Sequence, residues 1–460
     1  MRARKIRPGI AAAAALAVAG MVLAGCAEDE GDEGTNTAEG TSPGEGKAGC
    51  EQLVQFGDLT GEEVSLYTSI VAPEDQPHID SYDLFEECTG ATVNYEGSKE
   101  FEAQLVVRAK SGNPPDLAYI PQPGLLNTLV TDTDAVVAAP GPVEENVDEF
   151  FGEDWKAYGT VDGTFYAAPL GANVKSLVWY SPSMFADNGW EIPQTWDDMI
   201  ALSDQIADEG KVKPWCAGIE SGEATGWPAT DWLEDVLLRT GGPDVYDQWM
   251  NHEIPFNDDA VVEGLDTVGD ILKNEDYVNG GFGDVKSIAT TAFQDGGLPI
   301  VDGKCAMHRQ ANFYAANWPE GTNVAEDGDV FAFYLPPIGE DFGNPVLGGG
   351  EFVAAFNDNT VTQAFQTYLS SDVWANEKAK ATPAGGWVSA NNGLDTANLV
   401  SPIDQLSAEI LADPDATFRF DASDLMPGEV GAGSFWREMT AWITGQSTEE
   451  SLEKIESSWP

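Results

Sequence analysis

Basic residues are scarce in this chain. Its 460 residues include 22 Lys and Arg against 78 Asp and Glu, which gives a formal net charge of −56 at pH 7. A chain with this charge repels nucleic acid and anionic lipid. We interpret the surplus acid as a solvated surface rather than as an acid-specific function. The composition therefore excludes a nucleic-acid partner and disfavours an anionic substrate.

Histidine and the common catalytic motifs are scarce or missing. The three histidines, at positions 78, 252 and 308, show no metal-ligand spacing, so the sequence predicts no metal site. No G-x-S-x-G elbow, P-loop or dinucleotide-binding fingerprint occurs. The run Gly348–Gly350 lacks a following Lys-Ser/Thr and is better explained by close backbone packing. We predict no cofactor and no enzymatic activity, although the many acids leave paired-carboxylate glycoside hydrolysis as the alternative.

Hydrophobic runs long enough to cross a membrane are also missing. The apolar run Ile10–Ala24 is short for a span, follows four basic residues and leads into Leu23-Ala24-Gly25-Cys26. This order is typical of a lipoprotein signal peptide. We expect residues 1–25 to be removed and Cys26 to carry a diacylglyceryl group and an amide-linked acyl chain such as palmitate.

The stretch 26–49 contains almost no large apolar side chains and is rich in Glu, Asp, Gly, Thr and Ser. Such a segment buries too little apolar surface to offset the entropy lost on ordering, so we expect a disordered acidic tether. The protein would then be exported and anchored by lipid to the outer face of the cytoplasmic membrane.

Only five cysteines occur in the chain. If Cys26 carries lipid, the other four can form two disulfide bonds, as suits an exported protein. Three connectivities are possible for Cys50, Cys88, Cys216 and Cys305.

The most informative stretch that is present is Val161–Met199. It predicts an extended entry up to Pro169, a break at Gly171 and a β-rich run from Val174 to Tyr180. A helix then begins at Thr195, whose spacing to Asp198 has the form of a capping box.

The motifs of this stretch occur in the order G-x-x-Y-A-x-P, an apolar strand ending in Tyr, and F-x-x-x-G-W-x-x-P-x-T-W-D-D-M. This order resembles the crossover of bacterial extracellular solute-binding proteins, the receptor subunits of ABC importers. The resemblance extends from about Cys50 to Pro460. It is nearest to the group similar to maltose-binding protein, in the branch that binds α-glucosides.

The resemblance implies an α/β, two-lobed periplasmic-binding-protein fold. Each lobe would be a mainly parallel sheet with flanking helices, and the hinge would have two to three crossovers. Lobe 1 would comprise residues 50–170 and 337–372, and lobe 2 residues 171–336 and 373–460. Because a disulfide between lobes would clamp the hinge, we predict the pairs Cys50–Cys88 and Cys216–Cys305.

In lobe 1 the expected ligand contacts follow the predicted strands, because ligands bind beyond the carboxyl ends of strands in open parallel sheets. These candidates are Ser69, Glu74, Tyr119 and Gln122. For Tyr119, plain packing explains the residue equally well. Three more candidates come from the segments GGGEF and PAGGW, namely Gly350, Glu351 and Trp387.

In lobe 2, Trp227 and Asp231 lie at the mouth of a predicted helix, where Asp231 could instead be only a cap. Resemblance to the family adds Gln310, Asn312 and Phe313 after a Gly-Lys-x-Ala-Met strand, and Asp424 and Trp436 near the C-terminus. Aromatic rings that stack on sugar C–H faces, with polar groups for the hydroxyls, suit a pyranose.

We therefore expect a lipid-anchored receptor that binds a small neutral sugar, an α-glucoside or maltose-type disaccharide, between two lobes. Hinge closure would present the monomeric receptor to the permease subunits of an ABC importer. Stacking would come chiefly from lobe 2, and the exported glycoside hydrolase remains the alternative.

Overall fold

The computed structural model describes residues 42–339 and 341–460. The predicted signal peptide, the lipidation site Cys26 and the tether up to residue 41 lie outside the described residues. The expected tether ends earlier than position 49, because residues 42–46 form a turn that packs on the folded chain. The Ser42 hydroxyl is buried and donates a hydrogen bond to the Cys88 carbonyl.

The first sheet has the strand order β2-β1-β3-β13-β6. Strands β1, β2 and β3 are parallel, as the sequence predicts, whereas β13 runs antiparallel to both β3 and β6. The strands span Glu63–Thr68 (β1), Thr92–Gly97 (β2), Leu117–Ile120 (β3), Ala167–Pro169 (β6) and Phe352–Ala355 (β13). The short hairpin of Thr160–Val161 (β4) and Thr164–Phe165 (β5) precedes β6.

The helices of this lobe are Gln76–Asp80 (α1), Asp83–Thr89 (α2), Phe101–Lys110 (α3), Pro123–Thr133 (α4), Gly141–Phe150 (α5), Glu153–Tyr158 (α6), Thr360–Leu369 (α13) and Asp372–Ala381 (α14).

The second sheet has the strand order β11-β8-β10-β9. The two-lobed α/β architecture is as expected, but the second sheet is not mainly parallel. Only β9 and β10 pair in parallel here, because β8 runs antiparallel to both β10 and β11. The strands span Leu177–Tyr180 (β8), Lys213–Trp215 (β9), Cys305–Arg309 (β10) and Phe331–Tyr334 (β11).

The helices of the second lobe are Pro182–Asn188 (α7), Trp196–Glu209 (α8), Trp227–Thr240 (α9), Gly242–Met250 (α10), Asp259–Leu272 (α11), Phe293–Gly296 (α12), Pro402–Ala412 (α15), Ala422–Leu425 (α16), Trp436–Thr444 (α17) and Thr448–Glu456 (α18). The hydroxyl of Thr195 caps α8 by accepting from the Asp198 amide, as the capping-box pattern predicts.

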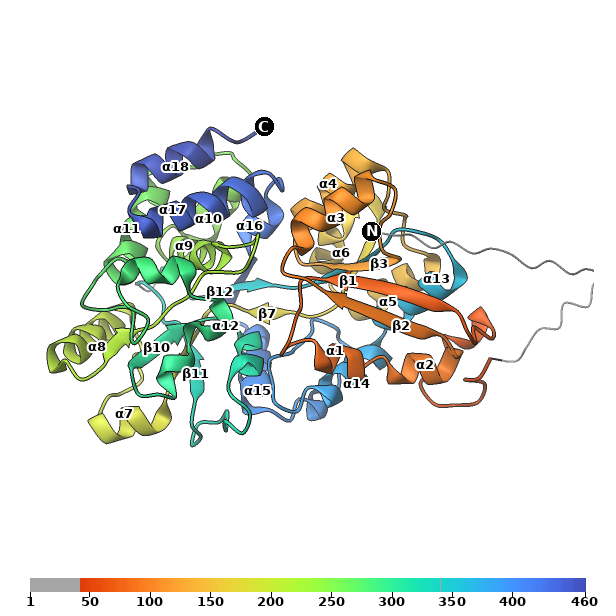
Figure 1. Ribbon diagram of the computed structural model, residues 1–460, viewed down its shortest axis with the longest axis horizontal. Coiled ribbons are helices and arrows are strands. Elements are labelled where there is room, and N and C mark those ends of the chain that lie inside the picture. Colours follow the sequence, from red (N-terminus) through yellow and green to blue (C-terminus); the bar gives the residue numbers. More distant parts are fainter. Residues whose placement is uncertain (1–41, 340) are drawn as a thin grey trace, which may run out of the picture. The chain divides into compact units, whose positions relative to one another are not determined.

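Three strands connect the lobes as a small sheet of order β14-β12-β7, comprising Ala416–Phe420, Asn344–Gly349 and Asn173–Val174. Strand β12 is parallel to β14 and antiparallel to β7. Figure 1 shows β7 and β12 side by side between the elements of the two larger sheets. This sheet begins just after Gly171, where the sequence places the first crossover.

The expected lobe boundary at position 372 does not match the packing. Trp374, Ala379, Trp387 and Leu399 are all buried in the core that contains β1 and α13. Ile403 of α15 is the next buried residue to join the other core. The chain therefore leaves the first lobe near residue 400, because α14 has its apolar partners there.

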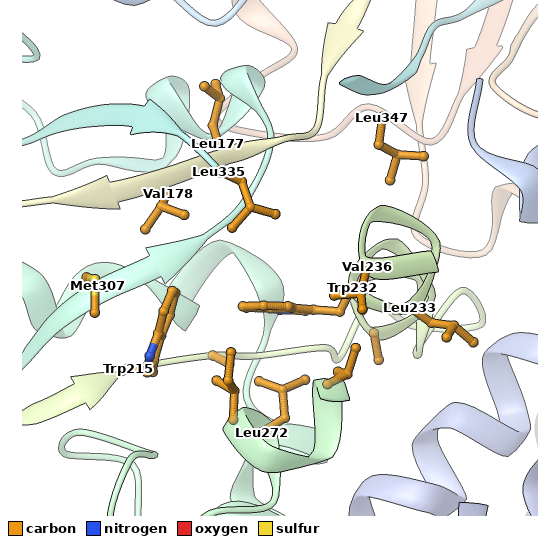
Figure 2. Packing of buried hydrophobic residues seen from close by; sticks show 14 of the residues in the cluster. Leu177, Val178, Trp215, Trp232, Leu233, Val236, Leu272, Met307, Leu335 and Leu347 are labelled. Atoms are coloured by element: carbon orange, nitrogen blue, oxygen red, sulfur yellow. The ribbon is translucent and has the colours of Figure 1, made fainter. Parts of the chain in front are cut away.

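Both predicted disulfide bonds are present, Cys50–Cys88 in the first lobe and Cys216–Cys305 in the second. Within the second lobe, the Trp215 and Trp232 rings meet edge to face at 5.5 Å. Figure 2 shows these rings among Leu233, Val236 and Met307. In the part of the chain that the structure covers, no helix has the length and apolar character to cross a membrane.

Candidate functional site

A cavity of about 180 Å³ lies between the ends of the first sheet, the connecting strands and the second lobe. Ten of the predicted ligand contacts line it: Ser69, Glu74, Gln122, Trp227, Phe313, Gly350, Glu351, Trp387, Asp424 and Trp436. They come from loops and helix ends far apart in the sequence. The carboxyl ends of β1 and β3 do face the cavity, as the open-sheet rule predicts.

Four predicted contacts lie outside the cavity lining, where each side chain contacts another protein group. Tyr119 is fully buried, and its hydroxyl lies 2.9 Å from that of Tyr82. Gln310 accepts a hydrogen bond from the Ala311 amide, and Asn312 accepts one from the Val174 amide. These side chains hold loops and the hinge entry, so their assignment as ligand contacts is not supported by the geometry.

Asp231 is the fourth of these residues and is neither a helix cap nor exposed to the cavity. It is fully buried on α9 and accepts a hydrogen bond from Lys175 at 3.1 Å. Arg309 lies 3.5 Å from its other oxygen. Asp231 thus acts beneath the site, as a partner of the lysine that lines it.

Lys175 forms the charged floor of the cavity and was not predicted from the sequence. Its ammonium contacts Asp231 and, at 2.5 Å, Asp421. Burial opposes its charge, yet the two carboxylates raise the Lys175 pKa well above its usual value. Burial likewise opposes ionisation of Asp421, but Lys175 lowers the Asp421 pKa to about 2. Lys175 and Asp421 are therefore charged at neutral pH, whereas burial raises the Asp231 pKa to about 7.

The sequence did contain a signal for Lys175. It is a base in an acidic chain, four residues after the Gly171 break and near the start of the β-rich run Val174–Tyr180. A base in that position must find a buried acid. The identity of that acid could not be predicted from neighbouring residues, because Asp421 lies 246 residues away in the sequence.

On the first lobe, Glu74 and Glu102 present carboxyls to the cavity. Burial raises the pKa of each to about 7. Glu74 accepts a hydrogen bond from Asn317 of the second lobe at 3.0 Å, and Glu102 accepts one from Gln122 at 3.3 Å. Neither carboxyl has an ion-pair partner within 4 Å among the described residues, so both can accept from a ligand hydroxyl.

Another polar group on the first lobe side consists of His78, Glu351 and Lys378. Burial lowers the Lys378 pKa to about 7, although nearby carboxylates oppose the shift. Lys378 donates to the Thr382 hydroxyl and lies 5.2 Å from the centre of the Trp387 ring. Its segment NEKAKA looks like an ordinary exposed helix end, so no local signal marks this lysine.

Aromatic side chains form the remaining walls. The Trp227 ring lies 5.0 Å from Phe293 and 6.0 Å from Phe313, measured between ring centres. The Lys175 ammonium lies 5.5 Å from the Trp227 ring centre. Trp436 lines the cavity from the start of α17. Three of these four rings, all but Phe293, were predicted from the sequence.

Unpartnered polar atoms concentrate at this cavity. Among the described residues, thirteen buried side-chain nitrogen or oxygen atoms have no hydrogen-bond partner. Five of them belong to cavity-lining residues: His78, Gln122, Gln294, Trp387 and Trp436. Buried polar groups are normally satisfied, so this concentration is typical of groups that a ligand completes. The five include indole donors and amide acceptors, which suits a ligand that both donates and accepts.

Comparison with known proteins agrees with this architecture. Residues 61–365, more than half of the chain, match the bacterial extracellular solute-binding protein family. The chain belongs to this family. The predicted two-lobed fold and the family resemblance are thereby confirmed.

Two relatives align in sequence with most of this solute-binding protein. The osmoprotective compounds-binding protein GgtB of Synechocystis sp. is 40% identical over 412 residues, which is 89% of this chain and 93% of GgtB. The alpha-glucosides-binding periplasmic protein AglE of Rhizobium meliloti is 38% identical over 423 residues, 89% of this chain and 87% of AglE. Among solved structures, maltose-bound MalE3 of T. maritima has a TM-score of 0.68 at 14% identity, covering 86% of this chain and 98% of MalE3. That last likeness shows the shared fold.

Proposed function

We propose that this solute-binding protein is the receptor of an ABC importer for a small neutral sugar, an α-glucoside or maltose-type disaccharide. The observation that carries the proposal is the lining of one cavity by aromatic rings, paired charges and unpartnered donors and acceptors. Sugar C–H faces pack on such rings, and hydroxyls complete such polar atoms. The name of AglE, which refers to alpha-glucosides, supports this class of ligand.

The charge of the lining favours a neutral ligand. Lys175 is already neutralised by Asp231 and Asp421, and burial lowers the Lys378 pKa to about 7, so neither of these buried lysines offers a full positive charge to an anionic sugar. The carboxyls of Glu74 and Glu102 would repel an anion directly. Export through the predicted signal peptide, lipid attachment at Cys26, a monomeric state and delivery to permease subunits complete the proposal.

A thermal-shift panel of neutral mono- and disaccharides tests the ligand class. A sugar that binds only the folded state raises the melting temperature, by an amount that corresponds to about 2.7 kcal/mol at a hundred times Kd. We expect maltose-type α-glucosides to give the largest shifts and charged sugars to give none. The proposal fails if no neutral sugar shifts the melting temperature. Release of glucose from aryl glucosides at enzyme-like rates would favour the hydrolase alternative.

The affinity is expected to depend on pH. Because a hydroxyl donates more strongly to an ionised carboxylate, sugar binding favours the ionised forms of Glu74 and Glu102, whose pKa values burial raises to about 7. The affinity should therefore fall about tenfold between pH 8 and pH 6. Calorimetry in two buffers of different ionisation enthalpy should also detect proton release on binding at pH 7.

Two variants sharpen this pH measurement. The substitution Glu74→Gln should flatten the pH profile, whereas Asp80→Asn, at an exposed acid of the same lobe outside the cavity, should leave it unchanged. A wild-type affinity that stays constant from pH 6 to pH 8 would show that neither carboxyl accepts from the ligand.

A further inference from the structure

The cavity wall formed by Trp387 depends on a short loop with unusual backbone geometry. Gly385 and Gly386 both have positive φ, at 87° and 108°. A Cβ on Gly385 would lie 2.3 Å from the Ser401 hydroxyl, and one on Gly386 would lie 3.2 Å from the Phe313 backbone. The loop therefore packs closely between α15 and the turn that carries Phe313. This packing restricts the backbone conformation and with it the orientation of Trp387.

One buried carboxylate holds this loop. Asp404, in the first turn of α15, is 2% exposed. Its Oδ1 accepts hydrogen bonds from the Gly386 amide at 2.6 Å and from the Trp387 amide at 3.1 Å. Successive amides that share one carboxylate oxygen fix the backbone orientation of both residues.

Asp404 belongs to a different lobe from the loop it holds. Ile403, its neighbour on α15, is buried in the second-lobe core, whereas Trp387 is buried with the first-lobe core and meets Trp374 edge to face at 5.8 Å. The next residue, Val388, accepts a hydrogen bond from the Ala172 amide at the first crossover. The two hydrogen bonds of Asp404 thus join the cavity wall to α15, and the Ala172–Val388 hydrogen bond joins it to the first crossover.

Asp404 does not itself line the cavity, whereas Trp387 does and has an unpartnered indole nitrogen there. We propose that Asp404 is the positioning residue for Trp387 and that, through this tryptophan, it sets the affinity of the site for its sugar. This inference rests on the proposed function, because the ligand is taken to be the sugar that the cavity binds. It assigns a role in binding to a residue that does not line the site.

A double-mutant cycle tests the proposal, with calorimetric titration of the sugar identified by thermal shift. Asp404→Ala should weaken binding about tenfold, whereas Asp404→Asn, which keeps an oxygen at Oδ1, should recover most of that loss. In a Trp387→Ala background, Asp404→Ala should cost less than about twofold, because the side chain it positions is gone. Asp395→Ala is the matched control, since Asp395 also accepts from a backbone amide but is exposed and outside the cavity.

The outcomes separate the two proposals. If Asp404→Ala weakens binding equally in both backgrounds, Asp404 does not act through Trp387, although the receptor function stands. If the wild-type protein binds no neutral sugar, the proposed function itself fails.

A readout without ligand covers the case in which Asp404→Ala does not fold. The indole N–H resonance of Trp387, assigned with Trp387→Phe, should shift in Asp404→Ser, whose short hydroxyl cannot reach both amides. An unchanged resonance in folded Asp404→Ser would overturn the proposal.

Discussion

Replacing Trp227 with alanine is expected to weaken sugar binding at least about thirtyfold while the protein stays folded. Trp227 lines the cavity with Phe293 and Phe313 at its edges, so it presents a ring to the ligand in a desolvated position. Truncating a central aromatic anchor of this kind typically costs about 2 kcal/mol or more. Calorimetric titration of the variant and the wild type measures the change directly.

Two variants serve as controls for this prediction. Trp227→Phe keeps an aromatic face and should retain part of the affinity. Trp459→Ala should bind like the wild type, because Trp459 stacks on His252 at 4.2 Å, outside the cavity lining. If well-folded Trp227→Ala binds its sugar with wild-type affinity, Trp227 only closes the mouth of α9 and makes no ligand contact.

Replacing Lys175 with methionine is expected to lower the free energy of unfolding by about 3–5 kcal/mol at pH 8. The substitution leaves the Asp421 carboxylate buried without its cation, and Asp231 with only Arg309. Isothermal denaturation monitored by tryptophan fluorescence measures the loss. Without its cation, the buried Asp421 carboxylate is destabilised and its pKa should rise. The loss of unfolding free energy should therefore be smaller at pH 5 than at pH 8.

The sign of this pH effect follows from the depressed pKa of Asp421 in the wild type, about 2. A carboxyl with a lowered pKa stabilises the fold above its unfolded pKa, and that stabilisation is lost only as the pH falls towards 2. Adding Asp421→Asn to Lys175→Met should restore part of the stability. Lys304→Met breaks an exposed pair with Asp302 and should change stability by less than about 1 kcal/mol. Equal losses in the two single lysine variants would contradict the central role of the buried cluster.

The order of the elements was predictable from local patterns, the family from the order of its motifs, and the disulfide pairing from the two lobes that the family resemblance implies. The break at Gly171, the strand up to Tyr180 and the cap at Thr195 all depend on residues close in the sequence, and each has its predicted form. The parallel β1, β2 and β3 follow from alternating strand and helix patterns in the same way. Cavity-lining positions were best predicted where a loop directly follows a strand or begins a helix, as at Glu74 and Trp227.

Polar residues near these positions could not be divided by sequence into ligand contacts and core contacts. Asp231, Gln310 and Asn312 have the right chemistry for a sugar, but each bonds to a protein group instead. Conversely, Lys378 looks exposed in the sequence and is buried beside Trp387. Burial and charge pairing depend on which distant segments meet, and local periodicity carries no information on that.

By itself, the sequence determined the fold family through its motif order and, through the lobes of that family, both disulfide bonds. It also determined several segments that surround the cavity, because these follow from short-range patterns. Only the tertiary structure decided that Lys175 pairs with Asp231 and Asp421, that Asp404 holds Trp387, and that the chain leaves the first lobe near residue 400 rather than at 372. These features join segments up to 246 residues apart. Their energies come from desolvation and from contacts that exist only once the lobes have packed.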